Sequence, residues 1–441
     1  MQDFSSQGAA METSATQRAQ GAEQTGRIKP ILAGGIGNLV EWFDWSAYAF
    51  LAPIFAQQFF PSSSPTASLL STLLVFAVGF FMRPLGAAII GSYSDRFGRS
   101  NALALTIFLM SAGALIIGLT PNAEAIGILA PIMLVFARLL QGFSAGGEFG
   151  SSATFMVEYA PPNRRAFVGS FQQVSVVGGT LLASAMAALL TSVLSAEDMA
   201  SYGWRIPFII GAVLGVVGLW LRRSIAEPES YAAAKAQGRQ VRTPLLEAIK
   251  RHPRAMLRVV LVTVAPTVVY YMWIIYLPTF ARSTVEASLS DALKANTIAL
   301  AALLFLLPLG GLLSDWIGRR ATMFMAAAGF ALLTWPLLTS MTGSFESILF
   351  VQLAGIALYA LFGANSCAIM VEQFPAEVRT AGVSLPYALA VAVFGGTAPY
   401  LSQWLNSQGS GHLFLVYVIA INVIGMIVYL TMPETKDKPL N

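Results

Sequence analysis

Five ionisable residues lie inside long apolar stretches of the sequence. They are Glu41, Asp44, Arg83, Arg138 and Glu148. Within a membrane helix an ionised side chain costs about 3 kcal/mol or more, so such a residue is functional by default. A carboxylate can carry a proton, and the planar guanidinium of arginine can hold a substrate carboxylate with two parallel hydrogen bonds. These residue types therefore indicate a site for a proton and an organic anion.

Two of these residues, Glu41 and Arg138, lie near the middle of a bilayer in the helices predicted to carry them. With about 1.5 Å of rise per residue, Glu41 and Arg138 each lie roughly 15 Å from one end of a helix, the depth at which transporter sites form. Glu41 and Asp44 are three residues apart and project from one helical face, where repulsion favours protonation of one carboxylate. One proton neutralises the whole cluster and releases an arginine for an anion. The sequence therefore predicts Arg138 and Arg83 as substrate ligands, and Glu41, Asp44 or Glu148 as proton carriers.

The alternative is that the five residues form buried ion pairs that only fix helix packing. Arg83 lies toward the cytoplasmic end of its predicted helix, where it would brace a gate. Glu148 also lies toward that end and follows Gly146 and Gly147, where close helix packing is expected. Both interpretations remain open at the level of the sequence.

The composition defines the class of protein. Of the 441 residues, 56% are hydrophobic and only 11% are charged, whereas soluble domains carry about 25% charged residues. The mean hydropathy is +0.66, which excludes a soluble globular protein, a disordered protein and a nucleic-acid-binding protein. One cysteine, Cys367, and two histidines, His252 and His412, provide neither a disulfide framework nor a metal site. We therefore expect no metal and no cofactor.

Apolar segments of membrane-spanning length recur along the whole chain. A bilayer core needs roughly 20 apolar residues per helix, and twelve such stretches are present. They lie near 31–55, 68–93, 100–119, 127–157, 166–194, 204–222, 255–281, 291–314, 321–341, 345–372, 379–404 and 411–432. The predicted fold class is an all-α integral membrane protein with twelve transmembrane helices.

The basic residues predict the orientation. Most lysines and arginines fall on one side of the membrane when the N-terminus is cytoplasmic, as the positive-inside rule requires. An even number of spans then places both termini in the cytoplasm. Residues 1–30 are rich in Ser, Gln, Ala, Gly and Thr, which predicts a disordered segment and no signal peptide.

An internal repeat divides the chain into two halves. GSYSDRFGR at 91–99 returns as GLLSDWIGR at 311–319, and the spacing of Glu158 and Arg165 returns in Glu372 and Arg379. We therefore predict six-helix halves at 31–222 and 255–432, a cytoplasmic linker at 223–254 and a cytoplasmic tail at 433–441. Parallel repeats suit alternating access to a site between the halves.

Several motifs carry a resemblance to a known family. The doubled G-x-x-x-D-R-x-G-R pattern in a 6+6 chain resembles the major facilitator superfamily over residues 30–435. The stretches GNLVEWFDW (37–45), FMRPLGA (81–87), ARLLQGFSAGGEFG (137–150) and WRIPF (204–208) are similar to its metabolite:H⁺ symporter family. Members of that family are bacterial inner-membrane carriers of organic acids such as α-ketoglutarate, citrate and shikimate, or of zwitterions such as proline and betaine. The resemblance implies the major facilitator fold, a multi-pass inner-membrane location and a monomer.

The resemblance also implies a cytoplasmic gate in which loop charges latch the two halves. In the second copy Trp316 replaces the basic residue that follows the aspartate, which weakens that half of the latch. The alternative is that these charges only determine the orientation of the protein in the membrane. The predicted gate residues are Asp95, Arg96, Arg99, Glu158, Arg165, Asp315, Arg319, Arg320, Glu372 and Arg379.

The predicted helices of the second half contribute no charge that we expect to be buried, so aromatic and amide groups are the candidates there. Tyr270, Tyr271 and Trp273 on the seventh span and Asn365 on the tenth can close over a small ligand and donate hydrogen bonds. Gln172 on the fifth span is a similar candidate in the first half. The alternative is that such residues serve helix packing or an interfacial belt.

These observations predict a secondary active transporter, and not an enzyme, that couples proton entry to uptake of a small carboxylate. Two arginines favour a di- or tricarboxylate such as α-ketoglutarate or citrate. The alternatives are a zwitterionic osmolyte such as proline or betaine, an aromatic or cyclic acid of the phthalate or shikimate type, anion exchange without protons, and a non-transporting sensor on a carrier fold. No G-x-x-x-x-G-K-[ST] motif is present for ATP. The expected partners are the organic anion, protons and the lipid bilayer, with no nucleic acid.

Overall fold

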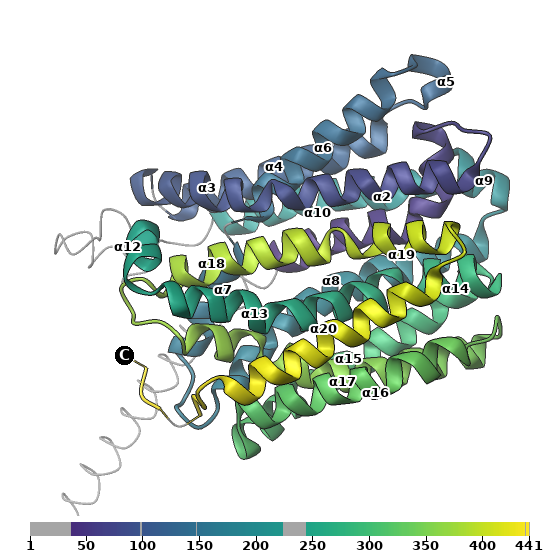
Figure 1. The fold of residues 1–441 in the computed structure, drawn as a ribbon. Coiled ribbons are helices and arrows are strands. Elements are labelled where there is room, and N and C mark those ends of the chain that lie inside the picture. The colour runs from purple at the N-terminus through teal and green to yellow at the C-terminus, as the bar shows by residue number, and fades with distance from the viewer. Residues whose placement is uncertain (1–36, 98, 147, 224–243, 437, 441) are drawn as a thin grey trace, which may run out of the picture.

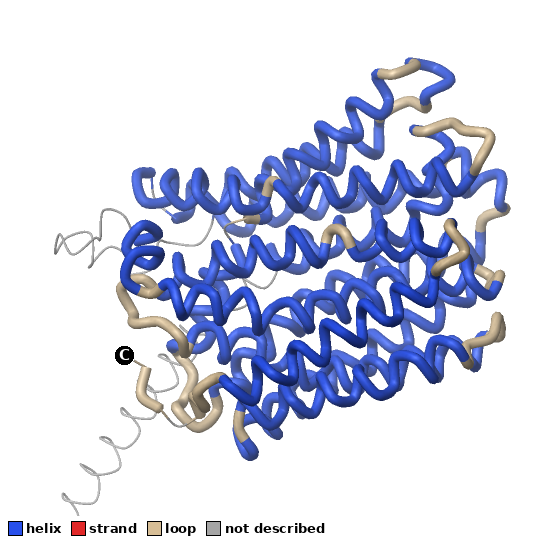
Figure 2. The backbone as a smooth tube through the Cα atoms, in the orientation of Figure 1, coloured by secondary structure: helices blue, strands red, loops and turns tan. Residues whose placement is uncertain are grey.

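The computed structural model describes residues 37–440 except 98, 147, 224–243 and 437. For some residues, among them Asp95, Arg96, Arg99 and Glu148, it describes the backbone alone. The predicted disordered segment 1–30 and most of the predicted linker 223–254 lie outside the described residues. Within the described part, every regular element is a helix, as Figure 2 shows.

The first half begins with a helix at residues 37–59. The elements that follow it are α2 (Pro65–Phe81), α3 (Arg83–Phe97), α4 (Arg99–Leu119), α5 (Ala123–Ile126), α6 (Leu129–Ala145), α7 (Glu148–Glu158), α8 (Arg165–Val193), α9 (Ala196–Ser201), η1 (Gly203–Arg205) and α10 (Ile206–Arg223).

The second half begins with a short helix that occupies the end of the predicted linker. Its elements are α12 (Pro244–Arg251), α13 (Pro253–Val269), the π-helix η2 (Tyr270–Tyr276), α14 (Leu277–Val285), α15 (Leu289–Ile317), α16 (Arg319–Thr339), α17 (Phe345–Val371), α18 (Arg379–Ala390), the π-helix η3 (Val391–Gly395), α19 (Ala398–Ser407) and α20 (Gly411–Thr431).

The described residues contain ten helices that are long and apolar enough to cross a membrane. The helix at residues 37–59 and α4 lie where the sequence predicts the two remaining spans. The prediction of an all-α, multi-pass membrane protein is therefore confirmed. In Figure 1 the long helices run side by side through one bundle, with α12 and the C-terminus at one end and α5 and α9 at the opposite end. We call the first of these the α12 end; its identity as the cytoplasmic end stays a prediction.

Local sequence explains the start of α2 and one helix distortion. Ser64 accepts a hydrogen bond from Ala67 N at 3.4 Å and Pro65 opens α2, which together form a favourable helix start. The π-helix η2 lies between Pro266 and Pro278. Because proline cannot donate the backbone hydrogen bond of an α-helix, the usual ladder is interrupted on both sides of η2. Single π-turns of this kind occur often at functional sites.

Glycines bring the arginine-bearing helices together. A Cβ atom on Gly142 of α6 would lie 1.8 Å from the carbonyl oxygen of Gly79 of α2, and one on Gly146 would lie 2.0 Å from that of Arg83. Only a residue without a side chain permits such a close backbone approach. The contact sets α6, which carries Arg138, directly against the junction of α2 and α3.

The two halves meet along several helix pairs. α8 packs against α15 and α17, α2 against α19, and α3 and α7 against α18. On α8, Ser184 lies 2.9 Å (Oγ to Oγ1) from Thr297 and accepts a hydrogen bond from Asn296 Nδ2 at 3.2 Å, both on α15. These contacts place any space that remains between the halves at the centre of the bundle.

Candidate functional site

Arg138 is completely buried and only partly hydrogen-bonded. Its Nη1 donates to Gln141 Oε1 at 2.6 Å, and its guanidinium carbon lies 3.8 Å from the ring centroid of Tyr48 and 4.4 Å from that of Trp45. Nε and Nη2 have no hydrogen-bond partner among the residues that the structure describes. A buried cation with unpaired donors is costly, so this group is suited to bind an anion.

Asp44 is linked to Arg138 through an amide. Gln141 Nε2 donates to Asp44 Oδ2, while Gln141 Oε1 accepts from Arg138. Asp44 is 1% exposed, and its Oδ1 has no hydrogen-bond partner within the described part of the chain. Asp44, Gln141 and Arg138 therefore form a relay that joins the helix at 37–59 to α6.

Arg83 forms a second unit with Glu41. Its Nη2 lies 3.4 Å from Glu41 Oε1, and both residues are almost completely buried. Its guanidinium carbon lies 4.5 Å from the ring centroid of Phe80 and 4.8 Å from that of Trp45. Trp45 therefore contacts both arginines, and its ring couples the two units.

The two carboxylates of the first helix thus bind different partners. The sequence predicts that Glu41 and Asp44 face one polar cavity. In the structure Glu41 pairs with α3 and Asp44 reaches α6 through Gln141. The reason is that residues three apart on one face still diverge enough to contact two neighbouring helices. The assignment of either acid as proton carrier stays a prediction, and the side chain of Glu148 lies outside the described residues.

A cavity lies between the halves. Both halves contribute to it, and none of the described residues that line it carries a charge. Its lining residues are Trp42, Phe149, Gln173, Val176, Val262, Thr263, Pro266, Thr267, Tyr270, Tyr271, Met323, Tyr359, Gly363, Ser366, Ile369, Met370, Tyr387 and Val391. The cavity is therefore mostly aromatic and aliphatic, with a few hydroxyl and amide groups.

The structure separates the predicted ligands of the second half into two groups. Tyr270 and Tyr271 line the cavity, whereas Trp273 and Asn365 do not. The indole N–H of Trp273 donates to the carbonyl oxygen of Val351 at 3.4 Å, and Asn365 Nδ2 donates to Thr322 Oγ1 at 2.9 Å. Both side chains thus make hydrogen bonds within the second half.

The predicted ligand Gln172 lies beside the cavity rather than in its lining. Its Oε1 accepts a hydrogen bond from Cys367 Sγ at 3.7 Å, and its neighbour Gln173 lines the cavity. Arg83 and Arg138 also lie outside the lining. The guanidinium carbon of Arg83 lies 5.6 Å from the ring centroid of Trp42, which lines the cavity, so Arg83 lies next to it.

Sequence reasoning missed three residues that line the cavity, namely Trp42, Phe149 and Tyr359. Trp42 contacts Tyr270 edge to face with 5.3 Å between centroids, and Phe149 stacks on Tyr387 at 3.6 Å. Tyr359 accepts a hydrogen bond from Gln173 at 2.9 Å. Trp42 lies within the motif GNLVEWFDW (37–45), so the sequence offered a reason to name it as a site residue. Tyr359 lies in an apolar stretch of α17, where no pattern distinguishes it from a packing residue.

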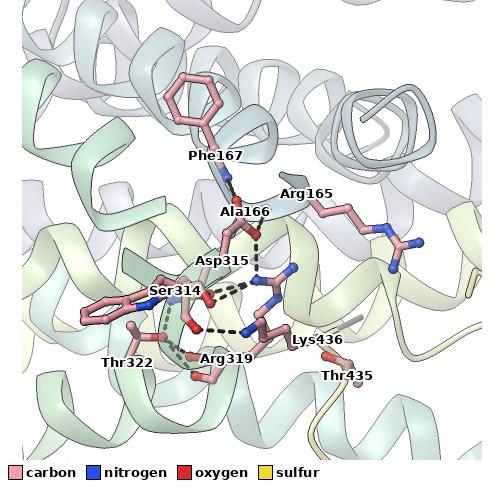
Figure 3. Close-up of polar contacts among 12 residues, drawn as sticks. Arg165, Ala166, Phe167, Ser314, Asp315, Arg319, Thr322, Thr435 and Lys436 are labelled. Atoms are coloured by element: carbon pink, nitrogen blue, oxygen red, sulfur yellow. Dashed lines mark hydrogen bonds and ion pairs between the residues drawn. The ribbon is translucent and has the colours of Figure 1, made fainter. Parts of the chain in front are cut away.

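Asp315 joins the two halves at the α12 end. Its carboxylate accepts hydrogen bonds from the backbone N–H groups of Ala166 at 3.0 Å and Phe167 at 2.9 Å, in the first turn of α8. Arg319 Nη1 lies 2.7 Å from the same carboxylate. Figure 3 shows these contacts. A carboxylate from the second half therefore caps a helix of the first half, where the helix dipole favours negative charge.

The repeated Glu–Arg pairs cross between the halves. Glu158 of the first half lies 2.5 Å from Arg379 of the second, and Glu372 of the second lies 3.6 Å from Arg165 of the first. Arg319 also reaches Glu372 at 3.2 Å. The crossed pairing follows from the repeat, because each half supplies the same two charges. We call these residues and Asp315 the gate cluster.

Other predicted gate residues lie elsewhere or are not described. Arg320 donates to the carbonyl oxygens of Tyr429 at 3.2 Å and of Leu430, so it contacts the end of α20. The side chains of Asp95, Arg96 and Arg99 lie outside the described residues. The role of the whole set as a gate stays a prediction.

The C-terminal segment supports the turn that carries the gate cluster. Burial acts to raise the pKa of Glu434, but hydrogen bonds from the backbone N–H groups of Lys436, Arg320, Arg319 and Thr435 outweigh it and hold that pKa below its usual value. Glu434 therefore remains ionised at neutral pH and fixes the start of α16.

We expect replacement of Asp315 with alanine to loosen the gate cluster. Two hydrogen bonds to a charged group would be lost, each with a net contribution of about 1.5–3 kcal/mol, so opening should become at least about tenfold more frequent. Cys367, the single cysteine, is fully buried and lies beside Gly169 of α8 between the halves. Its rate of labelling by a small maleimide should rise by a similar factor.

Asp291 offers a matched control for this experiment. It pairs with Lys294 at 3.2 Å on the exposed surface of α15, so Asp291→Ala should leave the labelling rate of Cys367 unchanged. Equal labelling of the wild type and Asp315→Ala would show that the contact does not hold the halves together.

The membrane bundle, the cavity between the halves and the crossed charge pairs define a membrane transporter. The sequence profile of the Major Facilitator Superfamily matches residues 34–305, and that described as sugar (and other) transporter matches residues 225–441. The chain belongs to the major facilitator superfamily. It is a transporter and not an enzyme.

Curated relatives of similar length support this membership. The chain is 38% identical to the alpha-ketoglutarate permease of Escherichia coli (strain K12), with 92% of this chain and 94% of the relative covered. It is 38% identical to the citrate-proton symporter of Klebsiella pneumoniae, with 86% and 85% covered. It is 31% identical to the proline/betaine transporter of Salmonella typhimurium, with 93% and 84% covered.

A solved structure supports the fold independently. The partially occluded inward-open conformation of the xylose transporter XylE from E. coli matches with a TM-score of 0.73 and 20% identity, over 94% of this chain and 99% of that one. This structural similarity confirms the predicted major facilitator fold.

Proposed function

We propose that the protein couples proton entry to uptake of a small organic acid, most simply a di- or tricarboxylate such as α-ketoglutarate or citrate. Transport would proceed by alternating access across a bacterial inner membrane, with both termini in the cytoplasm and the proton gradient as the driving force. The observation that carries the proposal is a pair of buried arginines, Arg83 and Arg138. Each has at least one N–H group without a partner among the described residues, and each is linked to a carboxylate of the first helix. Arg83 lies next to the cavity through its contact with Trp42.

The geometry supports coupling between proton and anion. The 3.4 Å separation between Arg83 and Glu41 is long for a charge-assisted hydrogen bond. Protonation of Glu41 removes its attraction for Arg83, whose guanidinium can then bind a substrate carboxylate in its place. Asp44 and Arg138 repeat the arrangement through Gln141, which gives a second acid whose protonation would release an arginine.

The names of two relatives agree with this substrate class. One is a permease for alpha-ketoglutarate and another is a citrate-proton symporter. The match covers 94% of the first relative and 85% of the second.

A zwitterion such as betaine is the second candidate. The aromatic lining, in which Tyr270 contacts both Trp42 and Tyr359, could hold a quaternary ammonium group by cation–π attraction. One relative is a proline/betaine transporter. The unpaired N–H groups of the two arginines favour the carboxylate, because a zwitterion needs only one of them.

Uptake into proteoliposomes tests the proposal. The purified protein would be reconstituted, an acidic exterior imposed, and the entry of labelled α-ketoglutarate followed with citrate, succinate, shikimate, phthalate and betaine as competitors. We expect a protonophore to abolish accumulation and carboxylates to compete. Binding of betaine or proline alone, with no carboxylate uptake, would contradict the proposal and support the zwitterion.

A further inference from the structure

Tyr271 presents an unpaired hydroxyl at the cavity. The residue is 2% exposed and lines the cavity, yet its hydroxyl has no hydrogen-bond partner among the described residues. A buried hydroxyl without a partner loses free energy relative to water, so it is rarely retained without a ligand. Its position on the π-helix η2 is a second departure from regular structure at the same place.

The ring of Tyr271 is held in one position. It meets Phe80 of α2 edge to face, with 5.4 Å between centroids and 90° between planes. On another side lies Gly395 of η3, where an added Cβ would be 2.4 Å from Tyr271 Cε2. The hydroxyl is therefore fixed by contacts from both halves, as a preorganised donor must be.

Phe80 connects this hydroxyl to a cation. The guanidinium carbon of Arg83 lies 4.5 Å from the ring centroid of Phe80, and the same Phe80 ring meets the ring of Tyr271 edge to face. The guanidinium of Arg83 therefore belongs to the first half and the hydroxyl of Tyr271 to the second. A ligand with acceptors at both ends can bind both groups at once.

Tyr359 supplies a second oriented hydroxyl. Its oxygen accepts a hydrogen bond from Gln173 Nε2 at 2.9 Å, so its own proton remains available to a ligand. Tyr359 lines the same cavity, and its ring lies 5.6 Å from that of Tyr270. The lining thus offers hydroxyl donors without a carboxylate, which suits an acceptor-rich ligand.

We propose that Tyr271, assisted by Tyr359, binds the distal carboxylate of a dicarboxylate whose first carboxylate is held by Arg83, and so selects dicarboxylates over monocarboxylates. The inference rests on the proposed function. A dicarboxylate spans from the first half to the second, whereas a monocarboxylate reaches Arg83 alone. Only the longer acid then draws the halves together around the cavity.

Replacement of Tyr271 with phenylalanine tests the inference. The natural pair of probes is α-ketoglutarate and 2-ketobutyrate, which lacks the distal carboxylate. A hydrogen bond to a charged group corresponds to about a tenfold to hundredfold change in affinity. Tyr271→Phe should weaken binding of α-ketoglutarate by that factor in uptake competition and leave binding of 2-ketobutyrate unchanged.

Thermal stability separates this role from a structural one. Because the hydroxyl has no partner among the described residues, its removal should not lower the unfolding temperature of the ligand-free protein. The stabilisation that added α-ketoglutarate confers on the wild type should shrink in Tyr271→Phe.

Tyr276 on the same π-helix is the matched control. Its hydroxyl donates to Gln403 Oε1 at 2.6 Å and it does not line the cavity. Tyr276→Phe should leave the ratio of the two affinities unchanged. Equal weakening of both acids by Tyr271→Phe, or no change in either, would overturn the inference. Failure of the wild type to take up any carboxylate would instead refute the proposed function, so the two failures are distinguishable.

Discussion

Replacement of Arg83 with lysine is expected to lower the affinity for the organic acid about a hundredfold, while the protein still folds. Lysine keeps the positive charge and can still pair with Glu41. It lacks the planar fork that makes two parallel hydrogen bonds to a carboxylate, and it stacks less well on Phe80 and Trp45. Each charge-assisted hydrogen bond contributes about 1.5–3 kcal/mol, so the loss of one accounts for most of this effect.

The measurement is the concentration dependence of uptake in proteoliposomes, with Arg138→Lys tested in parallel. Neither arginine lines the cavity, but Arg83 contacts the lining residue Trp42, whereas Arg138 stacks on Tyr48 and Trp45. The comparison therefore decides which arginine holds the substrate. Arg205→Lys is a control, because Arg205 bonds to the carbonyl oxygens of Gly118 and Thr120 outside the site. Unchanged affinity in Arg83→Lys would remove Arg83 from the substrate site.

Replacement of Asp44 with asparagine is expected to abolish proton-driven accumulation and to preserve substrate exchange. Asparagine has nearly the same shape and still accepts the hydrogen bond from Gln141, but it cannot ionise. It therefore imitates the protonated carboxyl permanently, which leaves Arg138 without a negative partner through the whole transport cycle. Counterflow of labelled acid between equal concentrations should continue, because exchange requires no net proton movement.

Glu41→Gln serves as the companion variant. If Asp44 is the proton carrier, Glu41→Gln should retain accumulation with altered affinity, because Glu41 pairs with Arg83. The reverse result, with accumulation lost only in Glu41→Gln, would assign the proton to Glu41. Full accumulation by Asp44→Asn would exclude Asp44 from coupling.

The membrane architecture could be predicted from the sequence because a bilayer imposes a simple rule. Each crossing needs roughly 20 apolar residues, so the predicted stretch 166–194 corresponds to α8 at Arg165–Val193 and the stretch 411–432 to α20 at Gly411–Thr431. A charge in such a stretch stands out without any knowledge of its neighbours. That is why Arg83 and Arg138 could be named before their surroundings were known.

The partners of those charges could not be predicted. Whether Glu41 reaches Arg83 or Arg138 depends on how the first helix is rotated and on how closely α6 approaches α2, which the contact between Gly142 and Gly79 determines. Those segments are far apart in the sequence, and no local pattern encodes their relative rotation.

The sequence by itself determined the membrane class and the residue types capable of carrying a proton and an anion, and it predicts two duplicated halves. Only the tertiary structure decided that Gln141 joins Asp44 to Arg138, that Tyr271 rather than Trp273 meets the cavity, and that the repeated charges pair across the halves. The reason is physical. Hydrophobic length is a property of each segment, whereas side-chain partners follow from helix rotation and crossing, which arise only when all the helices pack together.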